Sequence, residues 1–215
     1  MAALTRARFD GAVAALAAAD ADLGAVVDAF GPPPIWRRPA GFPTLALLIL
    51  EQQVSLASAK AACDRLTEAC GGTLAPASVL ALDDAAMRAA GVSRQKTRYI
   101  RELAGAVAGG ALRLDRLGRA DDEAVRAQLT AIVGIGNWTA DIYMMMALGR
   151  PDVWPVGDLA LQVAAQAVKR LPHRPDAETL TGLGEAWRPW RAVAARILWH
   201  YYLNTVRQRR GESPA

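Results

Sequence analysis

Apolar side chains recur along most of the chain at intervals of three and four residues, the spacing of one face of an α-helix. No stretch shows sustained alternation of apolar and polar residues between turn signals, so the pattern does not predict strands. Clusters of glycine and proline separate the apolar segments, and they lie at residues 31–34, 38–43, 71–72, 109–110 and 171–175. The pattern therefore predicts an all-α protein.

Two segments illustrate where the predicted helices begin and end. Ser55 precedes a helical pattern that continues to residue 70, and Gly71 follows it. A serine N-cap and a glycine just beyond the C-terminus suit these positions. The alanine-rich residues 1–23 predict one N-terminal helix, and the aspartates within them are unlike a signal or transit peptide.

Composition narrows the class of protein. A chain of 215 residues can bury a core without metals or disulfides. Its only cysteines are Cys63 and Cys70, which excludes a disulfide framework and a four-cysteine cluster, so we expect a reducing, cytoplasmic location, at the nucleoid in a bacterium. The longest strongly apolar run, residues 45–50, is far shorter than the roughly 20 residues of a membrane-spanning helix, and no membrane partner is expected.

The net charge is +4 and is carried almost wholly by arginine. A surplus of this size permits nucleic acid binding without requiring it. The only lysines are Lys60, Lys96 and Lys169, and none of them lies near the two glycine motifs described next.

The sequence VGIG at residues 133–136 joins two predicted helices, residues 121–132 and 137–148. So short a connection needs backbone angles that glycine adopts easily, and we expect a positive φ at Gly134 and Gly136. The two glycines also leave room for another backbone segment to approach. On their own, they suit a structural turn as well as a binding loop.

The helix after this turn begins at Asn137 and Trp138. The first N–H groups of a helix lack helical partners and lie at the positive end of its dipole. The amides of Gly136, Asn137 and Trp138 would therefore suit a phosphate group.

A second break contains Pro155 and Gly157 and is followed by Asp158. The apolar pattern then continues to about Leu171, so Asp158 is the expected N-cap of a helix. A carboxylate in that place accepts backbone N–H groups at the positive helix end, and we expect it to be ionised at neutral pH. A capping role alone would account for the residue.

Together, the two glycine motifs resemble the helix-hairpin-helix DNA glycosylase superfamily. They read LTAIVGIGNWTA over Leu129–Ala140 and WPVGD over Trp154–Asp158. Residues 42–66 and 185–202 are similar to the 3-methyladenine DNA glycosylase II branch, the AlkA-like enzymes, and the resemblance covers roughly residues 35–205. It implies an all-α fold of two lobes with a cleft between them.

The resemblance places residues 1–42 and 151–215 in one lobe and residues 43–150, with the hairpin, in the other. It implies that Asp158 faces the cleft as the catalytic residue. Bifunctional members of the superfamily carry a lysine just after the hairpin, where this chain has Trp138. We therefore expect a monofunctional enzyme without lyase activity.

The substrate implied by the resemblance is double-stranded DNA with alkylated purines of the 3-methyladenine and 7-methylguanine type, flipped out of the stack. Such a base is already cationic, so hydrolysis of its N-glycosidic bond needs an ionised carboxylate beside the sugar and no general acid. We expect a monomer that requires no cofactor. The alternative is a non-catalytic helix-hairpin-helix module that recognises damaged DNA.

Three tryptophans and an isoleucine are the expected base pocket. Matched positions point to Trp138 and Trp199, with Trp154 nearby, because electron-rich indole rings attract a cationic base. Ile142 stands where the best-known member of the branch has an aromatic residue, so the pocket is expected to be less aromatic. Tryptophans on apolar helices also suit a structural core, and that alternative stays open.

The resemblance also implies a minor-groove plug and a cation site. Gln53 matches the plug position, and its neighbour Gln52 could serve the same role or be buried and hydrogen-bonded. The backbone carbonyls of Thr130, Ile132 and Ile135 would hold a monovalent cation, Na⁺ or K⁺, that bridges to a DNA phosphate.

A second candidate for anion binding lies in residues 91–103. Ser93 is the expected cap of a helix whose first turns contain Arg94, Lys96 and Arg98. Cations in that place oppose the helix dipole, so an anionic partner would stabilise them. A solvated basic face is the alternative.

Overall fold

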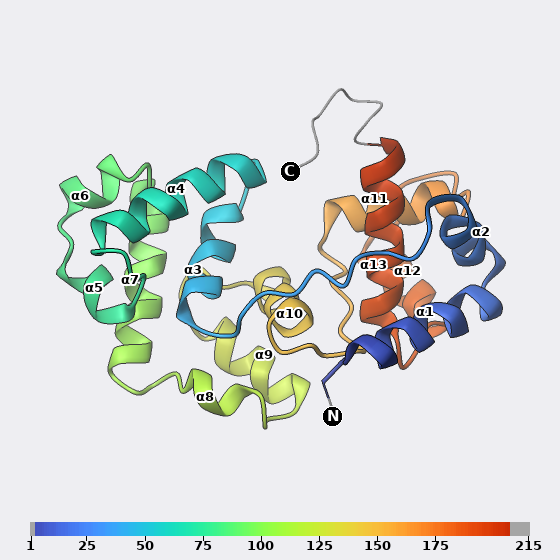
Figure 1. Ribbon diagram of the computed structural model, residues 1–215, viewed down its shortest axis with the longest axis horizontal. Helices are drawn as coiled ribbons and strands as arrows, with labels where there is room; N and C mark the ends of the chain where they lie inside the picture. The colour runs from blue at the N-terminus through green and yellow to red at the C-terminus, as the bar shows by residue number, and fades with distance from the viewer. Residues whose placement is uncertain (1–2, 207–215) are drawn as a thin grey trace. The chain divides into compact units, whose positions relative to one another are not determined.

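The computed structural model describes residues 3–206, which form helices and loops and contain no strand (Figure 1). The predicted all-α class is confirmed for this part of the chain. The chain divides into two compact units. Unit 1 comprises residues 3–37 and 149–206, and unit 2 comprises residues 38–148.

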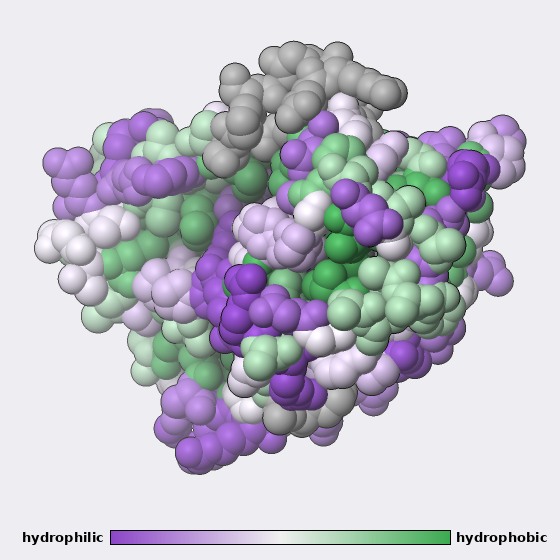
Figure 2. Space-filling model, turned by 45° about the vertical axis from the view of Figure 1, so that its right-hand side comes forward, coloured by the Kyte–Doolittle hydropathy of each residue, from purple (hydrophilic) through white to green (hydrophobic). Residues whose placement is uncertain are grey.

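The predicted boundaries of these units, after residues 42 and 150, each lie a few residues beyond the observed divisions. Within residues 3–206, no helix combines the length and the apolarity needed to span a membrane. Hydrophilic and hydrophobic residues are interspersed over the face shown in Figure 2.

Unit 1 forms around one buried helix. Its helices are α1 (Arg6–Ala19), α2 (Ala21–Phe30), α11 (Leu159–Val168), α12 (Ala177–Glu185), α13 (Arg191–Tyr201) and the π-helix η1 (Tyr202–Val206). Helix α13 is buried at every position from 192 to 199 and contacts α1, α2 and α11. A helix that is buried on all sides belongs in the centre of a core.

The N-terminal segment folds as two helices, and the prediction of one helix is wrong. Asp20 separates α1 from α2, because its carboxylate accepts the N–H groups of Asp22 and Leu23. Aspartate is a stronger N-cap than a helix former, and the alanine-rich surroundings concealed that signal. The same carboxylate accepts hydrogen bonds from Lys169 Nζ at 2.9 Å and Trp187 Nε1 at 2.8 Å.

Replacing Asp20 with asparagine should lower the free energy of unfolding by about 2 kcal/mol at pH 7. Burial raises the pKa of Asp20, but the hydrogen bonds from Lys169 and Trp187 outweigh it, and the net pKa is lowered. The stabilisation is therefore complete above the ordinary aspartate pKa and is lost as the pH falls below it. Thermal melts should show a Tm difference that shrinks below about pH 4; a difference independent of pH would contradict this assignment.

Unit 2 forms around a central helix of its own. Its helices are α3 (Phe42–Glu51), α4 (Leu56–Ala69), α5 (Pro76–Ala81), α6 (Asp84–Ala89), α7 (Arg94–Ala108), α8 (Leu114–Leu117), α9 (Asp122–Thr130) and α10 (Asn137–Met146). Helix α3 contacts α4, α7 and α10, and its Leu45, Leu48 and Ile49 are fully buried. Through its contact with α10, helix α3 packs against one of the two helices that the hairpin joins.

The caps predicted in unit 2 are confirmed. Ser55 accepts a backbone N–H at 3.1 Å at the start of α4, and Gly71 follows that helix with a φ of 77°. Ser93 caps α7 by accepting the N–H of Lys96. The Lys96 ammonium donates to the carbonyl of Leu50 at 2.6 Å, and burial lowers the pKa of Lys96. For Lys96, the alternative of a fully solvated basic face is therefore excluded.

Candidate functional site

The hairpin between α9 and α10 requires one of its two glycines. Gly134 lies in the left-handed region, with a φ of 94°, and the N–H of Ile135 donates to the carbonyl of Ile132 at 3.0 Å. A Cβ atom at Gly134 would lie 2.1 Å from Cγ of Tyr99 on α7. Both the backbone angle and the contact with Tyr99 therefore exclude a side chain. A side chain, rather than another backbone segment, takes the space that the glycine leaves.

The prediction of a positive φ at Gly136 is wrong. Gly136 is the N-cap of α10 and has extended backbone angles, with φ −93° and ψ 177°. An N-cap residue lies outside the helix in an extended conformation that any residue adopts. A Cβ atom at Gly136 would also meet nothing within 4 Å. Only the first glycine is needed to make the turn.

Helix α10 begins in a way that suits an oxyanion. Its N-cap glycine has no side chain, and no side-chain hydrogen bond caps the helix. Asn137 is exposed and Trp138 is half-buried. The first N–H groups of α10 therefore lie at an uncapped, positive helix end, beside a turn that gives a ligand access.

The two plug candidates have different roles in the structure. The Gln52 amide donates to the carbonyl of Gly134 at 2.9 Å and to the hydroxyl of Thr139 at 3.1 Å. This confirms the alternative that Gln52 is hydrogen-bonded, and it excludes Gln52 as a free plug. The end of α3 is thereby tied to the hairpin.

Gln53 remains the candidate for the plug. It is exposed, has a left-handed φ of 59° and makes no hydrogen bond to a described residue through its side chain. The adjacent Val54 and Leu56 are 47% and 46% exposed. These two apolar side chains are further candidates for a wedge. Their signal in the sequence is their position beside a glutamine pair where a helix ends.

Asp158 lies at the start of α11, as predicted. Its Oδ1 accepts the N–H of Leu161 at 2.7 Å and the indole N–H of Trp199 at 2.9 Å. The carboxylate is half-buried. The structure thus brings together two predicted site residues from distant parts of the sequence.

Trp36 is a residue of this site that the sequence did not indicate. Its indole packs edge to face against Trp199, with the ring centroids 6.5 Å apart. Trp36 has a positive φ of 39°, which is unfavourable for a large side chain. The preceding carbonyl, that of Ile35, accepts a hydrogen bond from Arg196 Nε at 2.8 Å. Burial is the main cause, and repulsion from Arg37 the second, of a lowered pKa of Arg196, about 10. The guanidinium group that donates to Ile35 is therefore still charged at neutral pH.

Trp154 and Ile142 belong to the hydrophobic core, and their predicted place in the pocket is corrected. Trp154 is 6% exposed, donates to the carbonyl of Leu180 at 2.9 Å and packs against Trp187 at 5.3 Å between ring centroids. Ile142 is 3% exposed, on the buried face of α10. Neither side chain offers a surface to a base. Trp138 in unit 2 and Trp199 in unit 1 remain candidates.

The three lysines are each engaged elsewhere. Lys60 pairs with Asp64 at 2.6 Å, Lys96 bonds to a carbonyl of α3, and Lys169 pairs with Asp20. The histidine close to the site, His200, lies 3.0 Å from the carbonyl oxygen of Phe30 and is structural.

The carbonyls predicted to bind a cation lie at the end of α9 and in the turn. That of Ile132 accepts one hydrogen bond, from the N–H of Ile135, which leaves a second lone pair. Carbonyl oxygens suit Na⁺ or K⁺. The oxygens of Thr130, Ile132 and Ile135 are chemically compatible with such a cation, and its binding stays a prediction.

The sequence and the fold were compared with those of known proteins. Residues 47–189 match the family described as HhH-GPD superfamily base excision DNA repair protein. The crystal structure of a DNA-3-methyladenine glycosidase from Bacillus halodurans is 35% identical in sequence, with a TM-score of 0.77 over 90% of this chain and 89% of that chain. The 3-methyladenine DNA glycosylase of Schizosaccharomyces pombe in complex with abasic DNA is 26% identical, with a TM-score of 0.80 over 88% and 95% of the two chains.

A curated relative, DNA-3-methyladenine glycosylase 1 of Schizosaccharomyces pombe, is 31% identical over 58% of this chain and 55% of its own length. The chain spans about half the length of the curated relatives it matches.

Proposed function

The chain belongs to the HhH-GPD superfamily of base excision DNA repair proteins, and we propose that it is a monofunctional DNA glycosylase that releases alkylated purines from double-stranded DNA. The relatives named as 3-methyladenine glycosylases support this substrate class. The observation that carries the proposal is the carboxylate of Asp158, held by Leu161 and by the indole of Trp199.

A purine alkylated at N3 or N7 carries a positive charge, so its glycosidic bond weakens without added protonation. Positive charge then develops on the deoxyribose in an oxocarbenium-like transition state. The carboxylate of Asp158 stabilises that charge and orients or deprotonates the attacking water. Trp199 and the backbone N–H of Leu161 fix the position of the carboxylate before the substrate arrives.

Hydrolysis by water is favoured over attack by an amine. A glycosylase that also cleaves the strand forms a Schiff base through a lysine or another amine. Trp138 occupies the position after the hairpin, and Lys60, Lys96 and Lys169 have other partners. The reaction therefore ends at an intact strand with an abasic site.

The hairpin and the loop after α3 supply the contacts with DNA. The first amides of α10 bind a backbone phosphate, and a monovalent cation on the hairpin carbonyls would add positive charge beside it. Gln53 fills the space left by the flipped base and hydrogen-bonds to the widowed partner. Trp138 and Trp199 each carry an electron-rich indole ring, which attracts a cationic base.

The purified protein should release methylpurines from methylated duplex DNA, and strand nicks should appear only after alkali. Borohydride should trap no covalent complex, whereas a lyase-active glycosylase used as a control would be trapped. Tight binding to damaged DNA without base release would favour a non-catalytic module instead. In that case Asp158 would cap α11 through the N–H of Leu161 and join it to α13 through the indole of Trp199, with no catalytic role.

A further inference from the structure

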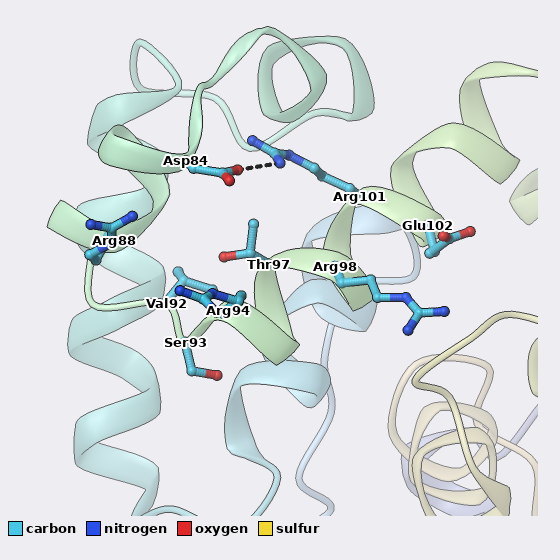
Figure 3. A pocket seen from close by; sticks show the side chains of 9 residues that line it. All are labelled: Asp84, Arg88, Val92, Ser93, Arg94, Thr97, Arg98, Arg101 and Glu102. Atoms are coloured by element: carbon cyan, nitrogen blue, oxygen red, sulfur yellow. Dashed lines mark hydrogen bonds and ion pairs between the residues drawn. The ribbon is translucent and has the colours of Figure 1, made fainter.

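A cavity of about 560 Å³ lies between α6 and the first half of α7 in unit 2. Figure 3 shows the side chains that line it. They comprise four arginines, two acids and three smaller residues: Arg88, Arg94, Arg98, Arg101, Asp84, Glu102, Val92, Ser93 and Thr97. Its volume is in the range of ligand-binding pockets.

Positive charge predominates in this cavity. Arg101 pairs with Asp84, so these two charges neutralise each other. Arg88, Arg94 and Arg98 are exposed and form no ion pair or side-chain hydrogen bond with a described residue. The remaining acid, Glu102, is also exposed, and in Figure 3 it lies on the side toward which Arg98 extends.

The hydroxyl of Thr97 is an independent sign of a ligand. Thr97 is only 7% exposed, and its hydroxyl makes no hydrogen bond to a described residue. In contrast, Thr67 and Thr130 donate to the carbonyl four residues earlier, as helical threonines do. In Figure 3 the hydroxyl of Thr97 points to the side of the cavity where Arg88 and Arg94 lie.

We propose that Thr97, Arg88 and Arg94 form a site for a phosphate group of the DNA backbone, separate from the hairpin. A phosphate accepts hydrogen bonds from guanidinium groups and from a hydroxyl. It would give Thr97 the partner that it lacks. It would also compensate the cations at the N-terminus of α7, which oppose the helix dipole.

DNA is the favoured source of this phosphate because the cavity leads toward the hairpin. A second cavity of about 390 Å³ shares Arg101 and Glu102 with the first and extends to Ala131, Ile132 and Val133. The distance along α7 from Thr97 to Gly105, which lines the second cavity, is about 12 Å. This corresponds to three or four base-pair steps of about 3.4 Å. A duplex bound at the hairpin can therefore place a neighbouring phosphate in the first cavity.

The test compares the affinity for a duplex of about two helical turns, with an abasic-site analogue at its centre, and for two shortened duplexes, each of which ends about two base pairs from the analogue on one side. Arg88→Gln combined with Arg94→Gln should weaken binding of the longer duplex about tenfold and reduce the salt dependence by about one phosphate contact. One of the two shortened duplexes should bind the variant and the wild-type protein equally, because it ends before the cavity.

Thr97→Val separates a binding role from a structural one. Valine has nearly the same shape and removes a hydroxyl that makes no hydrogen bond within the described residues, so the Tm should stay nearly equal. Affinity for the longer duplex should still fall about tenfold, through the loss of a hydrogen bond to a charged group. Thr97→Ser should restore it.

Arg119→Gln is the matched control, because Arg119 is an exposed arginine of unit 2 that lines neither cavity. Unchanged affinity and salt dependence in the cavity variants would overturn the proposal. It would also be overturned if the variants lost binding of inorganic phosphate, followed by calorimetry, and bound DNA normally, since the site would then serve free phosphate.

This inference rests on the proposed function, because that function is the reason to assign the phosphate to DNA. The phosphate site and the glycosylase activity can nevertheless be refuted independently. The affinity measurements need no base release, so they decide on the cavity even if the wild-type protein releases no methylpurine. If the glycosylase activity is present, base release by the cavity variants at low protein concentration should fall in proportion to their loss of affinity.

Discussion

Replacing Asp158 with asparagine should reduce base release by at least about 100-fold while the fold and the binding of DNA persist. Asparagine is as good an N-cap as aspartate. Its side-chain oxygen can accept the same N–H groups of Leu161 and Trp199 that the carboxylate accepts. The substitution therefore removes the negative charge and can keep these two hydrogen bonds, so a loss of rate with unchanged stability reports stabilisation of the oxocarbenium-like transition state.

The measurement is the single-turnover rate of methylpurine release, with the Kd for duplex DNA and the Tm as controls. Trp199→Phe is the companion variant, because it keeps a ring against Trp36 and removes only the N–H that holds Asp158. It should slow release about tenfold and leave the Kd nearly unchanged. Full activity of Asp158→Asn would refute the catalytic assignment.

Replacing Gly134 with alanine should lower the free energy of unfolding by about 3 kcal/mol and weaken DNA binding. Two costs combine: an L-residue in the left-handed region costs about 1–2 kcal/mol, and a methyl group forced into a packed site costs about 1–3 kcal/mol. The methyl group would meet Cβ and the ring of Tyr99 on α7. Either the ring or the turn must move.

Gly136→Ala is the matched control in the same loop. Its backbone is extended and its surroundings are open, so its cost should be about 1 kcal/mol or less. Denaturant unfolding gives the stability, and the Kd at fixed salt gives the affinity of the folded protein. Equal effects of the two substitutions would contradict the turn geometry. A loss of stability in Gly134→Ala without a loss of affinity would mean that the hairpin is only structural.

Local signals were sufficient to predict much of the fold. Helix caps depend on one side chain and the next few N–H groups, so Ser55, Ser93 and Asp158 could be assigned from neighbouring residues alone. The helical spacing of apolar residues gave the all-α class for the same reason. Asp20 was missed because a single cap inside an alanine-rich segment competes with a strong helical composition.

Side-chain roles that depend on distant residues could not be predicted. The core position of Trp154 is set by Leu180 and Trp187. Likewise, the packing of Trp36 on Trp199 joins residues from opposite ends of the chain. No spacing in the sequence distinguishes a tryptophan in the core from one at a surface, because both occur on apolar helices.

The hydrogen bonds of Gln52 have a consequence for the thermodynamics of binding. They join the end of α3 to the hairpin, so the loop that carries Gln53 and the hairpin amides are ordered together when the protein folds. In the proposed complex, these two segments then have little conformational entropy left to lose when DNA is bound, and such preorganisation increases affinity without adding any contact. The two loops should also release DNA as one body, which makes dissociation a single cooperative event.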